Sequence, residues 1–260
     1  MSTILTPDNY YFDKQYITHS MIKDFLEKGE YYYYLKHIKG LKEKFVRKDY
    51  FDFGTAVDIY FEGGPEEFKR KVHIVDRRTG NVPFGHVELT KTAGDMALRC
   101  IDEMLAQPLI RYYNNGQKQA ILQVEDYRGC KIKGKLDNLN VEEGFISDIK
   151  TTANIENFDP HGYDKQLAMY WIMAEIIYGK KFDLVLCVVD KYDDFQRSEV
   201  FKMSDETRER ATDEIHKALA TIKDRMEFDT WAIPVARNEI YGNGLYKEMP
   251  NYKIQDPIIF

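Results

Sequence analysis

The stretch GKLDNLNVEEGFISDIKTT, residues 134–152, predicts a β-hairpin whose charged side chains can meet. Strand-like runs flank a turn at VEEG, residues 141–144. Asp148 and Lys150 share one face of the second strand, because residues i and i+2 of a strand point the same way. Pairing across the turn brings Asp137 near Asp148, so that the two carboxylates can converge. Without a cation these carboxylates would repel each other, and one would tend to stay protonated.

Two interpretations of this hairpin remain open. In the first, it binds Mg²⁺, which takes carboxylate, water and phosphate oxygens as ligands, while Lys150 offsets negative charge that develops in a transition state. In the second, alternating Asp and Lys side chains simply cover an exposed strand face, as they often do in hairpins. Asp is disfavoured in strands, yet both aspartates fall inside strand-like stretches. This context favours the metal site.

The composition of the chain is that of an ordinary globular protein, with 260 residues, 43% hydrophobic and 31% charged. We expect no membrane partner and no signal peptide, because no apolar run is long enough to span a bilayer and the start lacks a basic-then-apolar pattern. Three scattered cysteines without a CxxC motif predict a reduced, cytoplasmic protein without a cysteine-built cluster. The net charge of −6 argues against broad nucleic-acid binding but allows a local basic groove.

The order of elements predicts a helical first part followed by an α/β core. Hydrophobic spacing predicts helices over 17–35, 51–64 and 91–112, with a loop over 65–90. The second part reads as three strands, a helix, two strands and a helix, at 119–127, 130–141, 145–151, 161–179, 182–190, 195–203 and 204–228. The run at 182–190 is almost unbroken in apolar residues, which indicates a strand buried on both faces.

Several short motifs, taken in order, resemble the PD-(D/E)xK nuclease core. They are GKLD (134–137), SDIKTT (147–152) and YDKQLAMY (163–170). More closely they resemble the RecE-like (exonuclease VIII-type) and RecB-type branch, which pairs G-(K/R)-x-D and D-x-K-T with a Q-x-x-x-Y helix. The segments 17–36 and 53–64 resemble the branch's aromatic-rich opening and its G-T-x-x-H helix.

This resemblance implies an α/β fold with a restriction-endonuclease-like core, in which helices flank a central mixed β-sheet, plus an N-terminal helical region. It implies a single nuclease domain over 1–260, in which 1–117 contributes one site helix and 118–260 forms the catalytic core. The implied roles are Mg²⁺ or Mn²⁺ ligation by Asp137, Asp148 and the Ile149 carbonyl, catalysis by Lys150, and positioning of the scissile strand or of water by Gln166 and Tyr170.

One position departs from the family pattern. Asp58 stands where the branch usually has a metal-binding histidine. A carboxylate can still ligate, and an all-oxygen site suits Mg²⁺. Glu62, one helical turn later, could share the site, and Glu125 resembles an acidic position on the preceding strand.

Two basic features are candidates for DNA contact. Lys131, Lys133 and Lys135 share a strand face that leads to Asp137, and they either attract the phosphate backbone or form an exposed strand face. The basic stretch 36–48 follows four tyrosines at 31–34, and it is either a surface that grips a nucleic-acid strand or a solvated helix end.

The resemblance thus implies a divalent-metal-dependent deoxyribonuclease, most similar to a RecE-like 5′→3′ exonuclease acting on linear duplex DNA in phage-type recombination. It also implies a ring-shaped homo-oligomer and a single-strand annealing partner, in the cytoplasm of a bacterial or phage-infected cell. No GxxxxGK[ST] motif is present, so we expect no ATP motor. An endonuclease is one alternative, and a catalytically impaired nucleic-acid-binding or assembly module, suggested by Asp58, is another.

Overall fold

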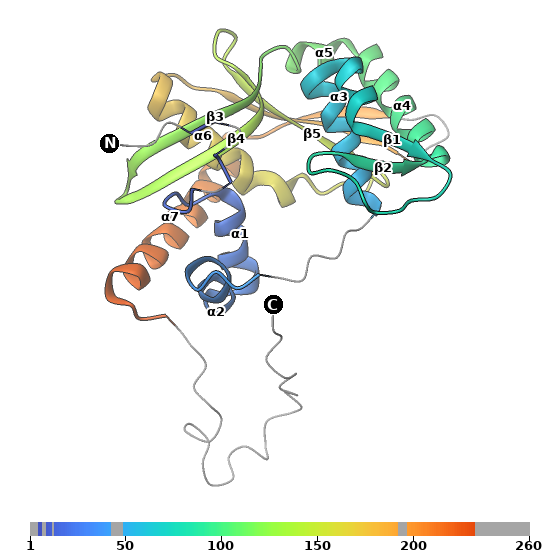
Figure 1. Ribbon diagram of the computed structural model, residues 1–260. Helices are drawn as coiled ribbons and strands as arrows, with labels where there is room; N and C mark the ends of the chain where they lie inside the picture. The colour runs from blue at the N-terminus through green and yellow to red at the C-terminus, as the bar shows by residue number, and fades with distance from the viewer. Residues whose placement is uncertain (1–4, 7–8, 12, 43–48, 192–196, 232–260) are drawn as a thin grey trace, which may run out of the picture. The chain divides into compact units, whose positions relative to one another are not determined.

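The computed structural model describes residues 5–6, 9–11, 13–42, 49–191 and 197–231 (Figure 1). The chain divides into two compact units, of which the first contains Met1–His19 and Arg47–His216 and the second contains Ser20–Val46 and Lys217–Phe260. The expectation of a single nuclease domain over the whole chain stays a prediction. None of the described helices has the length and apolar character needed to cross a membrane.

A mixed five-stranded sheet forms the centre of the first unit, with strand order β3-β4-β5-β6-β7. The strands are β3 (Gln117–Tyr127), β4 (Cys130–Asn140), β5 (Phe145–Thr152), β6 (Asp183–Asp190) and β7 (Ser198–Lys202). Only β5 and β6 pair in parallel, and the other neighbours are antiparallel. Every residue of β6 after the first is buried, so the burial predicted from its apolar run is confirmed.

Helices cover both faces of this sheet (Figure 1). They are α3 (Asp49–Lys71), α4 (Lys91–Ala106), α5 (Pro108–Tyr113), the 3₁₀ turn η2 (Pro160–Tyr163), α6 (Asp164–Tyr178) and the first part of α7 (Asp205–Phe228). Ser147 of β5 donates to a carbonyl of α5, whereas the next residue, Asp148, accepts from Gln166 of α6. Because successive strand residues face opposite ways, α5 and α6 lie on opposite faces. The predicted mixed sheet with flanking helices is confirmed.

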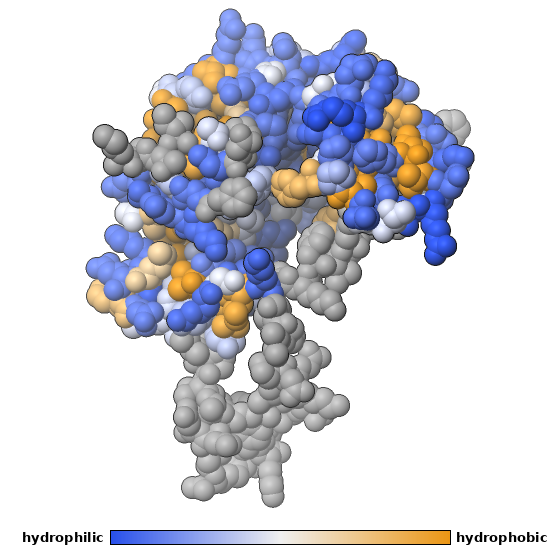
Figure 2. All heavy atoms as spheres, in the orientation of Figure 1, coloured by the Kyte–Doolittle hydropathy of each residue, from blue (hydrophilic) through white to orange (hydrophobic). Residues whose placement is uncertain are grey.

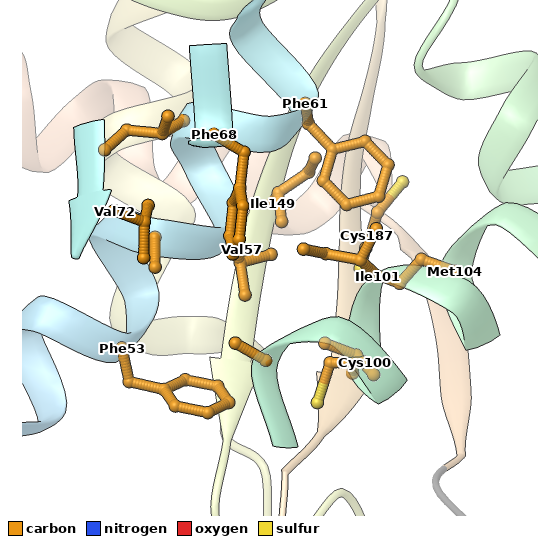
Figure 3. Packing of buried hydrophobic residues seen from close by; sticks show 14 of the residues in the cluster. Phe53, Val57, Phe61, Phe68, Val72, Cys100, Ile101, Met104, Ile149 and Cys187 are labelled. Carbon is orange, nitrogen blue, oxygen red and sulfur yellow. The ribbon is translucent and has the colours of Figure 1, made fainter. Parts of the chain in front are cut away.

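The core between α3, α4 and the sheet fixes α3 in place. Its members include Phe53, Val57, Phe61, Cys100, Ile101, Met104, Ile149 and Cys187, none more than 8% exposed (Figure 3). The three α3 residues recur every fourth position and so form one apolar stripe. Each fully buried large side chain contributes about 1.5–3 kcal/mol. This packing holds α3 against the sheet, and the adjoining edge of the helix carries acidic residues, because Asp58 and Glu62 directly follow two residues of the stripe.

A sharp break divides α3. Gly64 has a φ of 78°, and Pro65 follows it. The positive φ suits glycine, while proline cannot donate the backbone hydrogen bond that a continuing helix would need. The helix predicted over 51–64 therefore ends where its two glycines indicated.

The expectation of a loop over 65–90 is wrong in part. A second helical segment follows the break, and β1 (Val72–Val75) then pairs in parallel with β2 (Val87–Thr90). Four-residue strands are too short for alternation to reveal, and tertiary burial of Val72, Val87 and Leu89 against the α3–α4 core stabilises them. Near this pair, Figure 2 shows apolar side chains at the surface. Ile74 of β1 and Phe84, between β1 and β2, are exposed.

The helix expected over 91–112 is two helices, because Gln107 leaves the helical conformation and Pro108 opens α5. Thr90 caps α4 by accepting a hydrogen bond from the Ala93 amide. The interruption lets the short α5 direct backbone carbonyls at the sheet, where Asn138 and Ser147 donate to the Tyr113 carbonyl.

The second unit contains α1 (His19–Lys28) from Ser20 onward, α2 (Glu30–Tyr33), the π-helical turn η1 (Tyr34–Ile38) and the end of α7. Buried Asp24 binds Lys36 at 2.8 Å and His37 at 2.9 Å, and Tyr33 stacks on Trp231 with ring centroids 5.5 Å apart. Residues 43–48 of the basic stretch lie outside the described residues. Its predicted role in gripping a strand stays a prediction.

Candidate active site

The predicted hairpin of β4 and β5 is confirmed, and its register brings the two aspartates together. Asn140 pairs with Phe145, Leu139 with Ile146 and Asn138 with Ser147. One more step along both strands sets Asp137 opposite Asp148. The pairing of β4 with β5 ends at Asn138 and Ser147, while β4 continues beside β3 and β5 beside β6. The carboxylates therefore lie where the two strands separate, which leaves room for other side chains.

Asp148 and Lys150 form a buried ion pair on one face of β5. Asp148 is 1% exposed, and the Lys150 ammonium contacts its Oδ2 atom. That oxygen is buried and accepts no well-directed hydrogen bond among the described residues. Burial opposes the charge of Lys150, but Asp148 and Asp137 outweigh this effect and raise the Lys150 pKa. Lys150 is therefore a cation at neutral pH, beside a carboxylate oxygen that receives no well-directed hydrogen bond from the described residues.

The helix α6 supplies Gln166 and Tyr170 from one face, as their spacing of four residues predicts. The Gln166 side-chain nitrogen donates to Asp148 Oδ1 at 3.1 Å and to the Tyr170 hydroxyl at 3.0 Å. Burial, followed by the charges of Asp148 and Asp137, raises the pKa of Tyr170 well above its ordinary value. Tyr170 is thus a neutral hydroxyl, fixed by Gln166 next to the carboxylates.

Gly134 lets α6 approach the sheet at this point. A Cβ at Gly134 would collide with the end of Met173 and lie 3.1 Å from the Tyr170 ring. We expect Gly134→Ala to destabilise the protein by about 1–3 kcal/mol and to displace Tyr170 from Gln166, as urea unfolding and a crystal structure of the variant would measure. The control is Gly54→Ala in α3, whose Cβ would make an ordinary 3.6 Å contact with Thr151. Equal losses of stability in both variants would contradict this account.

Asp58 faces the hairpin from α3, on the same helix edge as Glu62. Burial raises the pKa of Asp58 to about 7; nearby Lys150 partly offsets this effect, and Asp148 adds to it. Burial and then the charge of Asp148 raise the pKa of Asp137 well above its ordinary value. Neighbouring carboxylates of this kind hold protons until a cation neutralises them. Asp58, Asp137 and Asp148 thus form one electrostatically linked carboxylate cluster.

Three residues near the cluster escaped the sequence analysis. Gln119 of β3 donates to Glu62 at 2.5 Å and to Asp137 at 3.5 Å. The Lys150 ammonium lies 5.1 Å from the centre of the Tyr163 ring. Burial lowers the pKa of Lys118 to about 8, and this lysine donates to Asn138 at 3.0 Å. Gln119 and Lys118 belong to no motif, and Tyr163 opens YDKQLAMY without an assigned role, so only the folded chain reveals their positions.

Glu125 is not brought to the cluster. Its carboxylate accepts from the Tyr16 hydroxyl and pairs with Lys131 at 3.1 Å. It lies six residues beyond Gln119 on β3, which corresponds to about 20 Å of strand. The acidic residue that joins the cluster instead is Glu62, through Gln119.

The three lysines of β4 share a face, but the N-terminal segment covers part of it and buries Lys133. Lys133 is 2% exposed and donates to the carbonyls of Tyr10 and Asp13. This burial speaks against the predicted DNA contact for Lys133, because its ammonium anchors the chain. Lys131 is engaged by Glu125, and Lys135 lies over the ring of Tyr11, 5.4 Å from its centre.

The cluster offers the donor set that a hard divalent ion prefers. Asp58, Asp137 and Asp148 supply carboxylate oxygens, and the buried Oδ2 atom of Asp148 contacts the Lys150 ammonium without a well-directed hydrogen bond from any described residue. Among the described residues, no three Asp, Glu, His or Cys side chains already form a metal-ligand cage. The oxygen chemistry therefore fits Mg²⁺ or Mn²⁺, and binding would require the carboxylates to close on the ion.

Fold and motifs together define a member of the PD-(D/E)xK superfamily. The chain belongs to the family described as PDDEXK-like domain of unknown function (DUF3799), whose model matches residues 18–238. The assignment to the RecE-like branch stays a prediction.

One solved structure supports the fold. A crystal structure named "Putative exonuclease" from Eubacterium rectale matches with a TM-score of 0.69 and 21% identity, over 94% of this chain and all of its own. At this identity the likeness shows the fold alone. The crystal structure of SSO0001 matches at 15% identity over 76% of this chain and 84% of its own, and its TM-score of 0.29 supports no argument. No curated protein matches the chain.

Proposed function

We propose that this protein is a divalent-metal-dependent nuclease that hydrolyses phosphodiester bonds of DNA. The observation that carries the proposal is the meeting of Asp137 and Asp148 at the point where β4 and β5 separate, with Lys150 in contact with Asp148. Acidic oxygens beside one buried ammonium suit a reaction in which negative charge builds up on a phosphate.

Each residue has a distinct part in this proposal. Asp58, Asp137, Asp148 and the Ile149 carbonyl would hold Mg²⁺ or Mn²⁺, which when bound supplies Lewis-acid activation of water and of the phosphoryl oxygen. Lys150 would stabilise negative charge on the attacked phosphate. Gln166 holds Asp148 and Tyr170 in place through its two hydrogen bonds. In this proposal both side chains would then face the scissile DNA strand.

Within the nuclease class, we favour a RecE-like 5′→3′ exonuclease on linear duplex DNA. The ordered motifs from GKLD to YDKQLAMY support this assignment. A ring-shaped oligomer, a single-strand annealing partner and a phage-type recombination role accompany it as proposals. Among the three β4 lysines, Lys135 remains the candidate for phosphate attraction. Burial raises the pKa of Asp58 and Glu62, and the positive charge of Lys135 is near enough to both carboxyl groups to offset part of this rise.

An impaired nucleic-acid-binding module is the second candidate, favoured by Asp58 in place of the usual histidine. The test uses purified full-length protein with Mg²⁺ or Mn²⁺ on duplex DNA, as a 5′-labelled linear fragment and as a closed circle. We expect stepwise degradation of the linear fragment from its 5′ ends, with the circle intact. Cleavage of the circle would indicate an endonuclease. Retention of DNA binding by folded protein without cleavage would contradict the nuclease and favour the impaired module.

A further inference from the structure

Gln119 has an unusual backbone for the interior of a strand. Its φ is 51°, in the left-handed region that side chains other than glycine seldom adopt. The register of β3 with β4 pairs Lys118 with Asn138 and Ala120 with Leu136, so Gln119 lies opposite Asp137. Backbone conformations of this kind persist only where the surroundings impose them, and they concentrate at functional sites.

At Gln119, the side chains of the paired strands β3 and β4 switch from one face of the sheet to the other. Asn138 donates to the Tyr113 carbonyl of α5 at 2.8 Å, whereas a Cβ on Gly134 would meet Met173 and Tyr170 of α6. Residues four apart in a regular strand point to the same face, yet these two face opposite helices. The reversal falls between them, at Asp137 and its neighbour Gln119.

The Gln119 side chain joins acidic residues from two elements. Its nitrogen donates to Glu62 of α3 and to Asp137 of β4. Its own Oε1 atom is buried and has no hydrogen-bond partner among the described residues. Such an orphaned amide oxygen is costly, but side-chain amide oxygens are also accepted ligands of hard divalent ions. A cation held at the cluster would give this oxygen a partner.

We propose that Gln119 is a positioning residue of the carboxylate cluster, holding Glu62 and Asp137 together so that both face a bound divalent ion. This inference rests on the proposed metal-dependent function and extends it to Glu62 and Gln119. The twisted backbone turns the amide toward α3, which a regular strand residue opposite Asp137 would not reach. The strained backbone of Gln119 thus allows its side chain to contact both Glu62 and Asp137.

The proposal predicts that stability and metal affinity move independently. Gln119→Gly removes the side chain and relieves the strain, so the thermal midpoint in EDTA should stay the same or rise by a few degrees. The Kd for Mn²⁺, measured from the electron paramagnetic resonance signal of free Mn²⁺, should rise about 10- to 100-fold. Arg128→Gly is the matched control, because exposed Arg128 has a φ of 54° in the β3–β4 turn. It should show the same stability change with an unaltered Kd.

A second variant covers the case in which Gln119→Gly fails to fold. Gln119→Asn keeps an amide that tolerates the left-handed backbone but shortens it by one methylene, so that it no longer spans Glu62 and Asp137. It should raise the Kd for Mn²⁺ while unfolding like the wild type.

An unchanged Kd in either folded variant would overturn the role of Gln119, and so would losses of affinity and stability in parallel. If Asp148→Asn abolishes Mn²⁺ binding while Gln119 variants retain it, only this inference fails. A wild-type protein that binds no Mn²⁺ would overturn the proposed function as well.

Discussion

Asp148→Asn is expected to lower nuclease activity about 1,000-fold or more, with little change in the stability of the metal-free protein. The substitution removes the carboxylate of Asp148, which is the most buried member of the cluster. An asparagine oxygen can still accept the hydrogen bond from Gln166. Without the charge of Asp148, Asp137 can give up its proton and become the counter-charge for Lys150. Loss of one of two repelling carboxylates also relieves the metal-free site. Asp148→Asn should therefore lower nuclease activity without lowering the stability of the metal-free fold.

Two measurements check this prediction. The rate of DNA degradation gives the activity, and thermal unfolding with and without Mn²⁺ gives the metal contribution. At 100 times its Kd the ion should stabilise the wild type by about 2.7 kcal/mol, and this increment should vanish in Asp148→Asn. Persistence of the Mn²⁺ increment would place the ion elsewhere.

Asp24→Asn is the matched control, because it alters another buried aspartate paired with a lysine, in the second unit. Burial raises the pKa of Asp24, but hydrogen bonds from Lys36 and His37 prevail and lower it overall. This variant should lose about 3 kcal/mol of stability, because it leaves cations without their partner, while the Mn²⁺ increment and activity persist. The Asp24 carboxylate stabilises the fold only while it is ionised. Its contribution should be present at neutral pH and be lost as the pH falls below the ordinary Asp value.

The sequence reveals those parts of the site that follow from local periodicity. Asp148 and Lys150 share a face because strands repeat every two residues, and Gln166 meets Tyr170 because helices bring residues four apart together. The turn after Asn140 then determines that Asp137 lies opposite Asp148. Such relations need no knowledge of distant packing, which explains why a single hairpin and one helix could be predicted in detail.

Relations that depend on tertiary packing escape this reasoning. Lys133 alternates with Lys131 and Lys135 as a surface residue would, yet the N-terminal segment buries it. Gln119 carries no motif, and its positive φ is invisible in a sequence because glycine is the residue that usually signals one. The strands β1 and β2 are stabilised by the α3–α4 core rather than by their own pattern.

Lys150→Met is expected to abolish activity and yet to tighten metal binding. In the metal-free protein the Lys150 ammonium contacts Asp148 and stabilises the charges of Asp148, Asp137 and Asp58. It therefore competes with any cation for the same oxygens. Its removal should lower the Kd for Mn²⁺ about 10-fold or more, since unit charges about 4 Å apart interact by several kcal/mol near a protein surface. The metal-free fold should lose about 3 kcal/mol, because Asp148 then loses its partner in a buried ion pair.

The sign of the change in Kd distinguishes this account from a general disturbance of the site. Lys150→Arg retains the charge and should keep the wild-type Kd, whereas Lys202→Met removes an exposed lysine paired with Asp183 at 2.7 Å and should alter stability by less than about 1 kcal/mol. Titration of each variant with Mn²⁺, followed by paramagnetic resonance, gives the affinities. Weaker binding by Lys150→Met would mean that the lysine organises the carboxylates rather than competing for them. Tighter binding without hydrolysis would instead assign Lys150 to the reacting phosphate, because the ion would be held better in a site that no longer stabilises the transition state.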